Sequence, residues 1–144
     1  VGIIHVGADS KVELKEKKDR VEDAIYAVKA ALQEGIVPGG GVALLNAASL
    51  QTADNIGQKI LFKALSSPYE TILDNAGLQN VVLHEGIGYG IDVTTGKEVD
   101  MIKTGIIDPV LVTKTALKNA VSVVSTIISA DCVISNIRIP HASS

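Results

Sequence analysis

The sequence predicts a mainly α-helical protein with small β elements at its edges. Apolar residues make up 47% of the 144 residues, but aromatic residues only 3%, so the core must consist largely of aliphatic side chains. Several long segments place apolar residues at the 3.6-residue spacing of one helix face. Short glycine-rich segments separate them, as expected of turns and small hairpins.

The first expected elements are a strand at residues 1–7 and a long helix that ends near residue 33. β-Branched residues dominate the strand, and a glycine ends it. Ser10 is the expected N-cap of the helix, because Glu13 follows at the spacing of a capping box. The first half of the helix, residues 11–20, is mostly charged, whereas the second half has one apolar face. The charged half is therefore expected to face solvent or to connect two bodies.

Three helices are expected in the middle of the chain. A loop with three consecutive glycines precedes the first of them, and a serine–proline pair followed by glutamate marks the start of the third. The expected elements are a loop at 36–41, helices at 42–50, 56–65 and from Ser67 to near Gly77, and a short turn at 81–83.

The C-terminal third is expected to begin with a hairpin within residues 85–100, where glycines mark the turns. Asp108 and Pro109 have the pattern of an N-cap and a first helical residue, so a long helix is expected from there to about residue 129. A strand at 132–137 follows. The long helix is apolar on nearly all sides and requires cover from every direction, so we expect partners that this chain does not supply.

Composition argues against several classes of function. Lys and Arg number 13 against 16 Asp and Glu, giving a net charge of −3, so no nucleic-acid partner is expected. No uninterrupted apolar segment reaches the roughly 18 residues of a membrane span, and no signal peptide is recognisable. The single cysteine, Cys132, fits a reducing compartment, and the histidines lack metal-site spacing. Cys132 and Met101 are interpreted as packed residues. The chain begins with Val, which we interpret as a segment of a longer protein.

Three places have residue types suited to chemistry, and each also has a simpler structural interpretation. Residues 38–41, the glycine loop, precede a helix. Their main chain can therefore approach a ligand at a helix N-terminus, or they can be a flexible connection. Asp23 could orient or deprotonate a water molecule, or simply face solvent on a charged helix. Asp108 could cap the last helix and also reach a ligand hydroxyl with its second oxygen.

Four segments form a pattern that extends over the chain. They are residues 15–24, which read Lys-Glu-Lys-Lys-Asp-Arg-Val-Glu-Asp-Ala, residues 34–45, which contain Val-Pro-Gly-Gly-Gly, and residues 105–109 and 112–117. Together and in this order they resemble the group I chaperonins, the GroEL-type family. The resemblance extends from Val1 to about Ile137.

The resemblance implies that the chain is the C-terminal portion of a chaperonin subunit. Residues 1–33 would supply the long helix of the intermediate domain, and residues 34–144 the C-terminal half of the equatorial, ATP-binding domain. In this family, heptameric rings of like subunits bind non-native polypeptides on apical domains, enclose them under a co-chaperonin and use ATP hydrolysis to drive the cycle. The apical domain and the first half of the equatorial domain would lie outside this chain.

The resemblance also implies roles for individual residues. Asp23 matches the catalytic aspartate that positions the water attacking the γ-phosphate of ATP. An ionised aspartate at position 92 can only accept a hydrogen bond, which suits an exocyclic amine. The implied nucleotide contacts are Gly39 and Gly40 against the ribose, Asp108 with the ribose hydroxyls, Ile106 against adenine, and Asp92 near the adenine amino group, with Val93 and Thr94 in place of two alanines.

The implied cofactors are ATP or ADP, with Mg²⁺ and K⁺ held by residues of the absent N-terminal part. No metal ligand is therefore expected in this chain, nor measurable ATP hydrolysis by the chain alone. The expected partners are the remainder of the subunit and like subunits, and the expected compartment is a bacterial cytoplasm or an organelle matrix.

The alternative function is a non-catalytic scaffold that self-associates through exposed aliphatic faces. A third alternative is a nucleotide-binding module that uses only the glycine loop. It is disfavoured, because the matches of Asp23 and Asp108 to the family would then be coincidental.

Overall fold

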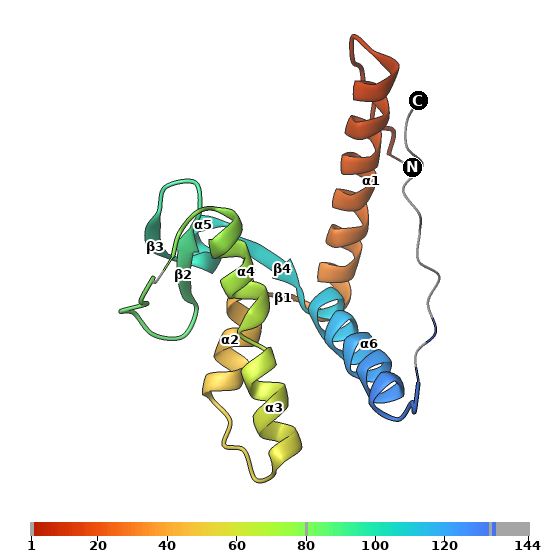
Figure 1. Cartoon of the computed structure of the whole chain (residues 1–144). Helices are drawn as coiled ribbons and strands as arrows, with labels where there is room; N and C mark the ends of the chain where they lie inside the picture. The colour runs from red at the N-terminus through yellow and green to blue at the C-terminus, as the bar shows by residue number, and fades with distance from the viewer. Residues whose placement is uncertain (1, 80, 133, 135–144) are drawn as a thin grey trace, which may run out of the picture. The chain divides into compact units, whose positions relative to one another are not determined.

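A computed structural model describes residues 2–79, 81–132 and 134 (Figure 1). The chain divides into two compact units, Val1–Thr113 and Lys114–Ser144. The structure confirms the mainly helical fold class, and the expected boundary between residues 33 and 34 stays a prediction. In chain order the elements are α1 (Lys11–Glu34), β1 (Ile36–Pro38), α2 (Val42–Ser49), α3 (Ile56–Ala64), α4 (Ser67–Asn75), β2 (Tyr89–Asp92), β3 (Lys97–Asp100), α5 (Met101–Thr104), β4 (Ile107–Pro109) and α6 (Val110–Ile128).

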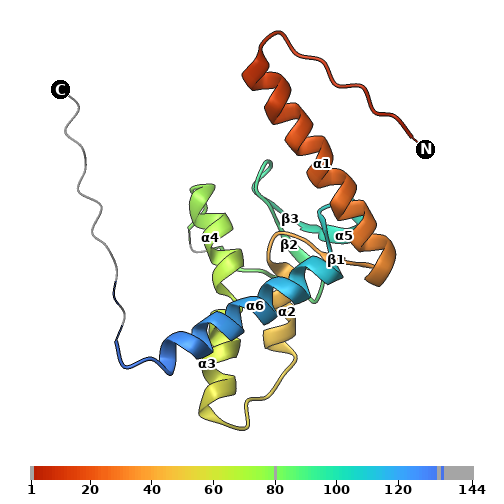
Figure 2. The same ribbon diagram turned by 90° about the vertical axis from the view of Figure 1, so that its right-hand side faces the viewer.

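Helix α1 begins and ends close to the predicted residues. Ser10 has extended backbone, and its Oγ accepts a hydrogen bond from the main-chain N–H of Glu13 at 3.2 Å. Gly35 ends the helix with a φ of 85°, in the region that favours glycine, and its N–H donates to the Ala31 carbonyl at 2.8 Å. No residue of α1 is buried, and the helix is continuous in both views (Figures 1 and 2).

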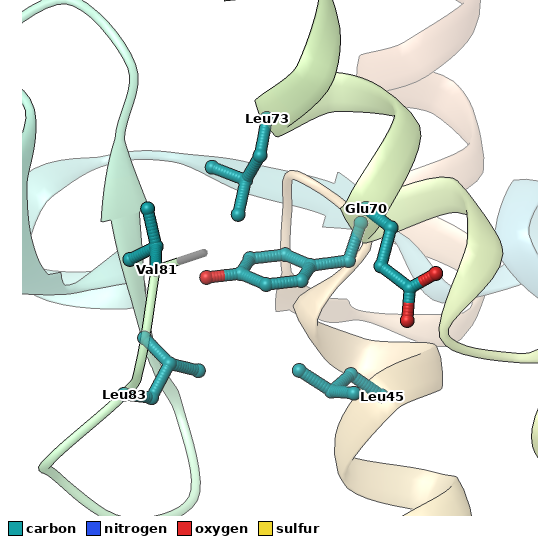
Figure 3. A pocket seen from close by; sticks show the side chains of 6 residues that line it. Leu45, Glu70, Leu73, Val81 and Leu83 are labelled. Carbon is teal, nitrogen blue, oxygen red and sulfur yellow. The ribbon is translucent and has the colours of Figure 1, made fainter. Parts of the chain in front are cut away.

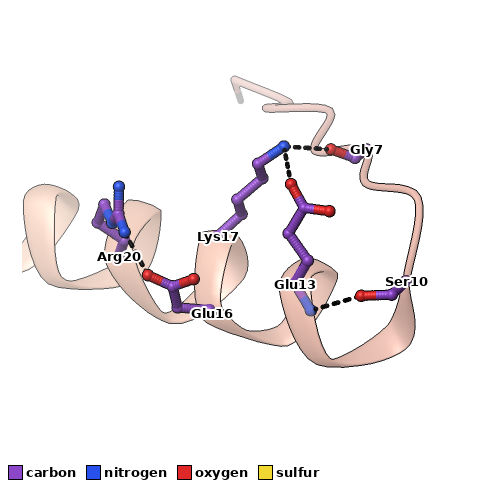
Figure 4. Close-up of polar contacts among 6 residues, drawn as sticks. All are labelled: Gly7, Ser10, Glu13, Glu16, Lys17 and Arg20. Carbon is purple, nitrogen blue, oxygen red and sulfur yellow. Dashed lines mark hydrogen bonds and ion pairs between the residues drawn. The ribbon is translucent and has the colours of Figure 1, made fainter.

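Charged side chains support the first turns of α1 (Figure 4). Lys17 Nζ lies 3.0 Å from Glu13 Oε1 and donates to the Gly7 carbonyl at 3.3 Å, so it ties the preceding segment to the helix. Glu16 and Arg20 form a second ion pair. Exposed pairs at this spacing each stabilise a helix by about 0.3–0.5 kcal/mol. They support the interpretation that the charged half of α1 faces solvent.

The short strands β1 and β4 form an antiparallel sheet that the sequence analysis missed. Val37 lies opposite Asp108, and Pro38 lies opposite Ile107. The prediction that residues 36–41 are entirely loop was therefore wrong for the first three of them. The two strands lie far apart in the sequence and are only three residues long, so no local pattern indicates their pairing.

The predicted N-cap role of Asp108 was also wrong. Asp108 and Pro109 belong to β4, and α6 begins at Val110. The main-chain N–H of Val110 donates to the carbonyl of Gly35 at 3.1 Å, so the start of α6 is anchored beside the end of α1. Because α6 does not need the Asp108 side chain as a cap, that carboxylate is available for other contacts.

The hairpin predicted within residues 85–100 is confirmed as β2 and β3, with Gly96 at a φ of 68° in its turn. Helix α5 follows directly and was not predicted, because four residues are too few to show a helical period. Asp100 caps α5, its Oδ1 accepting from the N–H of Lys103 at 3.1 Å. Gly105, at a φ of 82°, ends it.

The three predicted middle helices are confirmed as α2, α3 and α4. Asn55 caps α3, its Oδ1 accepting from the N–H of Gln58 at 2.9 Å. Helix α4 differs by one residue at its start, because Ser66 rather than Ser67 occupies the N-cap position. The glycine expected near its end, Gly77, has a φ of 74°.

The core of the first unit lies where α2, α4, α5 and the hairpin meet. Val42 and Met101 are its most buried side chains, with exposed fractions of 0% and 1%. Tyr69, Leu73 and Ile91 complete the buried cluster. Four of these five side chains are not aromatic, as the composition required. The cluster packs the start of α2, and with it the preceding glycine segment, against the hairpin.

Four smaller expectations were not met or lie outside the described residues. Residues 2–7 form no strand, because a strand requires a neighbour and no described residue pairs with them. Residues 81–83 have no regular structure instead of the expected turn. Of the predicted strand at 132–137, only Cys132 and Ile134 are described. Cys132 is exposed rather than packed.

The second unit contains the C-terminal part of α6. The valine and isoleucine side chains of this part of α6 are exposed, from 42% for Val121 to 78% for Ile128. By length and average composition α6 also meets the requirements of a membrane span, although charged and polar residues interrupt its apolar sequence. Core helices of soluble proteins meet the same requirements. The predicted long helix is confirmed, and its apolar character on nearly all sides stays a prediction.

Candidate functional site

The β1–β4 sheet brings together three of the predicted site residues. Gly39 follows β1 directly, and its main-chain N–H donates to the carbonyl of Ile106 at 2.9 Å. Asp108 lies two residues further along, opposite Val37 in the strand register. The glycine loop and Ile106 therefore meet at one end of this sheet, with Asp108 in the adjoining middle pair, although the loop lies far from both in the sequence.

The conformation of the glycine loop explains why side chains are excluded from it. Gly40 and Gly41 have φ values of 62° and 80°, in the region that favours glycine. A β-carbon on buried Gly39 would lie 3.1 Å from the main chain of Ile106, and one on Gly41 would lie 2.7 Å from the amide nitrogen of Tyr69. The main chains of Ile106 and Tyr69 thus pack against the loop and fix its position. Its Gly39 carbonyl accepts from Val42 at 3.1 Å, which starts α2.

Asp108 is a half-buried carboxylate that no described residue engages by a hydrogen bond. Partial burial disfavours its charged form and raises the pKa of the carboxyl. A carboxylate in this situation has all its lone pairs available to a ligand that can donate, such as a hydroxyl group. Its position next to the glycine loop makes it the polar group best placed to bind a ligand there.

Asp92, at the end of β2, is already partly engaged. Its Oδ1 accepts from the Thr94 N–H at 2.9 Å and the Thr94 hydroxyl at 2.6 Å, and its Oδ2 accepts from the Thr95 hydroxyl at 2.9 Å. The bonds from Thr94, followed by that from Thr95, lower the pKa of Asp92. A carboxylate offers about four acceptor positions, so one on Oδ2 remains for a donor such as an amine. Val93 is 42% exposed, and Thr94 is exposed as well.

Asp23 is not brought to the glycine loop by any described contact. It is an exposed residue of α1, eleven residues before the end of that helix at Glu34. At 1.5 Å per residue, this places it about 16 Å along the helix axis from the end that adjoins the sheet. Its predicted catalytic role stays a prediction.

Comparison with known proteins decides which family these features belong to. Residues 1–138 match the TCP-1/cpn60 chaperonin family. The chain belongs to this chaperonin family. Its fold agrees, because the crystal structure of a group III chaperonin in the open state matches with a TM-score of 0.72 and 26% sequence identity. The expected chaperonin relationship is confirmed.

The match covers 90% of this chaperonin chain but only 30% of the matched group III chain. The chain thus spans less than a third of that relative. The finer expectation of a group I chaperonin stays a prediction, since the matched structure belongs to group III.

A second feature of the chaperonin chain is a hollow of about 420 Å³ formed by α2, α4 and residues 81–83 (Figure 3). It is lined by Leu45, Tyr69, Glu70, Leu73, Val81 and Leu83. The Tyr69 hydroxyl is buried and has no hydrogen-bond partner in the described part of the chain. Burial, followed by the negative charge of Glu98, raises the pKa of Tyr69. The hydroxyl oxygen is itself inaccessible, so Glu70 is the polar lining residue that remains accessible to a ligand.

Glu98 holds one wall of this hollow in place. Its carboxylate accepts from the main-chain N–H of Glu85 at 2.8 Å and of His84 at 3.1 Å, which fixes the segment after Leu83 to β3. These bonds, the one from Glu85 first, lower the pKa of Glu98. Among residues 2–79, 81–132 and 134, no group of three or more His, Cys, Asp or Glu side chains could hold a metal ion.

Met101 is the site residue that sequence reasoning did not recognise as one. Its burial as a core residue is confirmed. It also contacts the glycine loop, because a β-carbon on Gly40 would lie 3.1 Å from Met101 Cε. The signal in the sequence was slight, since the residue lies in a one-turn helix between a capping aspartate and a glycine.

Proposed function

We propose that this chain is part of an ATP-dependent chaperonin subunit that assists protein folding in a ring-shaped chamber. The observation that carries the proposal is the junction of the glycine loop with Ile106 and Asp108 across β1 and β4. A glycine main chain beside an apolar residue and an unengaged carboxylate suits a nucleoside, which presents a flat base and a pair of ribose hydroxyls. Family membership supports the same function.

In this proposal the described residues bind the nucleoside half of ATP or ADP. Gly39 and Gly40 lie against the ribose, and Asp108 accepts hydrogen bonds from the ribose hydroxyls. Ile106 contacts adenine, and the remaining acceptor position of Asp92 binds its amino group beside Val93 and Thr94. The phosphates, Mg²⁺ and K⁺ are assigned to the remainder of the subunit. The described residues do not fit a metal site, so we assign them no step that involves the ion.

Asp23 is proposed to position the water that attacks the γ-phosphate. Its distance from the sheet along α1 means that hydrolysis requires α1 to change its position relative to the nucleotide. Such a movement would gate the reaction without altering its chemistry. Gly35, at the junction of α1 and β1, has the backbone freedom that a hinge needs.

The proposed partners are the remainder of the subunit and like subunits in heptameric rings. Co-chaperonin and non-native polypeptides would bind an apical domain outside this chain. We propose a bacterial cytoplasm or an organelle matrix as the compartment, and no nucleic-acid or membrane partner.

Nucleotide binding tests the proposal directly. A fluorescent ADP analogue titrated into the full chain is expected to bind, and Asp108→Asn should weaken binding about tenfold, the effect of losing a hydrogen bond to a charged group. Asp74→Asn is the matched control, because Asp74 is an exposed carboxylate on α4. Failure of the wild-type chain to bind, or equal binding by Asp108→Asn, would contradict the proposed site.

ATP hydrolysis supplies the second test. We expect no measurable turnover by the chain alone, since charge neutralisation of the transferred phosphoryl group is central to this chemistry and we assign the phosphate and Mg²⁺ ligands to the remainder of the subunit. Turnover is expected after addition of the complementary N-terminal part of a chaperonin subunit, and Asp23→Ala should abolish it. Turnover by the chain alone that Asp23→Ala removes would overturn this assignment.

The exposed aliphatic side chains of α6 favour a second candidate function, a non-catalytic scaffold that self-associates. Val123, Val124, Ile127 and Ile128 are 50–78% exposed. Apolar surface of this kind promotes association. Sedimentation should show concentration-dependent oligomers, and a monomer at every concentration would exclude the scaffold.

A further inference from the structure

We infer that Met101 is a positioning residue that couples the β2–β3 hairpin to the glycine loop, so that the two sides of the proposed nucleotide site move together. The inference rests on the proposed function for its effect on nucleotide affinity. The coupling itself rests on contacts among described residues alone.

A chain of main-chain hydrogen bonds passes through Met101. Its N–H donates to the carbonyl of Gly88, at the start of the hairpin, at 3.1 Å. Its carbonyl accepts from the N–H of Ile106 at 2.8 Å, and the carbonyl of Ile106 accepts from Gly39 at 2.9 Å. Three hydrogen bonds thus connect the hairpin to the first glycine of the loop.

The side chain of Met101 provides a second connection between the same two parts. A β-carbon on Gly90, in β2, would lie 3.0 Å from Met101 Sδ, and one on Gly40 would lie 3.1 Å from Met101 Cε. The thioether therefore fills the space between the hairpin and the loop. Met101 is only 1% exposed, so this contact is closed to solvent.

The two glycines show how closely this space is filled. A β-carbon on Gly90 would also lie 2.5 Å from Val42 Cγ2, so the absence of a side chain there lets Met101 and Val42 pack against the main chain of β2. Gly40, with its left-handed backbone, turns the loop over the Met101 methyl group. Shortening the side chain at 101 would remove the support beneath Gly40, so that this residue of the loop could move.

This arrangement predicts that truncation of Met101 lowers nucleotide affinity, although the proposed site assigns Met101 no contact with the nucleotide. Met101→Ala should weaken binding of the fluorescent ADP analogue on the order of tenfold, a usual size for coupling between two sites. Met101→Leu keeps nearly the same volume and should restore affinity to about that of wild type. Ile102→Ala is the matched control, because Ile102 is the next residue of α5 and is 49% exposed.

The test is nuclear magnetic resonance of the full chain with ¹⁵N-labelled glycine, which gives at most 13 amide signals. In Met101→Ala, the signals of Gly39, Gly40, Gly88 and Gly90 should shift or broaden, while those of Gly57 and Gly77 stay in place. Met101→Leu should restore the wild-type spectrum. A folded Met101→Ala variant with unchanged signals for Gly39 and Gly40 would overturn the coupling.

A second arm uses the wild-type side chain and does not depend on the folding of a variant. Met101 is the only methionine of the sequence, so labelling of the methionine methyl group reports on this position alone. Addition of ADP should shift that signal together with those of Gly39 and Gly40. If the glycine signals respond to ADP and the methyl signal does not, the inference is wrong. If wild type binds no ADP, the proposed function fails, and the ¹⁵N spectra of the variants still decide the coupling.

Discussion

The main chain of Tyr69 lies directly behind Gly41, and a β-carbon on Gly41 would lie 2.7 Å from the Tyr69 amide nitrogen and 2.8 Å from its α-carbon. This contact fixes the glycine loop against the first turn of α4. Gly41 also has a φ of 80°, so two independent constraints exclude a side chain there.

Gly41→Ala is therefore expected to lower the free energy of unfolding by about 3 kcal/mol or more. About 1–2 kcal/mol comes from the left-handed backbone and the rest from overpacking against main-chain atoms that cannot rotate away. Urea unfolding followed by circular dichroism measures the change. The matched control is Gly77→Ala, where φ is 74° but a β-carbon meets nothing within 4 Å. Equal destabilisation by the two substitutions would show that the contact with Tyr69 is unimportant.

Tyr69→Phe is expected to raise the free energy of unfolding by about 1 kcal/mol. The hydroxyl of Tyr69 is buried without a partner in the described residues, so its removal also removes a desolvation cost while the ring stays in the core. Tyr26→Phe should have no effect, since Tyr26 is 61% exposed. The unfolding midpoints of both variants provide the comparison, and a less stable Tyr69→Phe would mean that the hydroxyl has a partner.

Asp108→Asn is expected to stabilise the fold at neutral pH while it weakens nucleotide binding. The pKa of Asp108 is raised above its ordinary value of 3.8, so the folded state holds the proton to a higher pH than the unfolded state. The contribution of Asp108 to the free energy of unfolding of wild type is thus present at low pH, and it is lost as the pH rises through the raised pKa. The stability difference between the variant and wild type should grow over that interval. A variant less stable than wild type at pH 7 would indicate a hydrogen bond to the carboxylate.

Glu98→Gln is expected to have the opposite dependence on pH. The pKa of Glu98 is lowered below its ordinary value of 4.5, because the charged carboxylate accepts from Glu85 and His84. Its contribution is complete above pH 4.5 and is lost as the pH falls through the lowered value in the folded state. Wild type should therefore lose its stability advantage over the variant below pH 4.5, and a constant difference across pH 3 to 7 would contradict this. Glu70→Gln, an exposed carboxyl change beside the same hollow, is the control.

Much of the fold could be predicted because the local signals were complete. The Ser10 cap, the spacing of Glu13 and the glycine at position 35 fix α1 without any information from the rest of the chain. The hairpin was equally local, since its turn and both strands lie within residues 89–100. The β1–β4 pair could not be predicted, because its partners are remote in sequence and proline ends each of the two strands.

In the candidate site, too, features with a local sequence signal could be predicted, and features that depend on remote residues could not. Individual residues such as Gly39 and Asp108 could be selected by type and family resemblance, but their meeting depends on the remote strand pair. The misassignment of Asp108 as a helix cap shows why, since an Asp-Pro pair before an apolar helix has the same sequence pattern in either role. Met101 was missed because its importance lies in its contacts with Gly40 and Gly90, and no local pattern encodes those.

The pairing of Pro38 with Ile107 has a consequence for how the chain folds. Every residue of α2 to α5 lies between these two positions, so the sheet can close only after that whole segment has become compact. The entropy lost in closing such a long loop must be recovered by contacts that form earlier, and the hairpin and core helices are the local candidates for these. The glycine loop and Asp108 should accordingly come together among the last steps of folding. A nascent chain that ends before β4 would lack the site altogether.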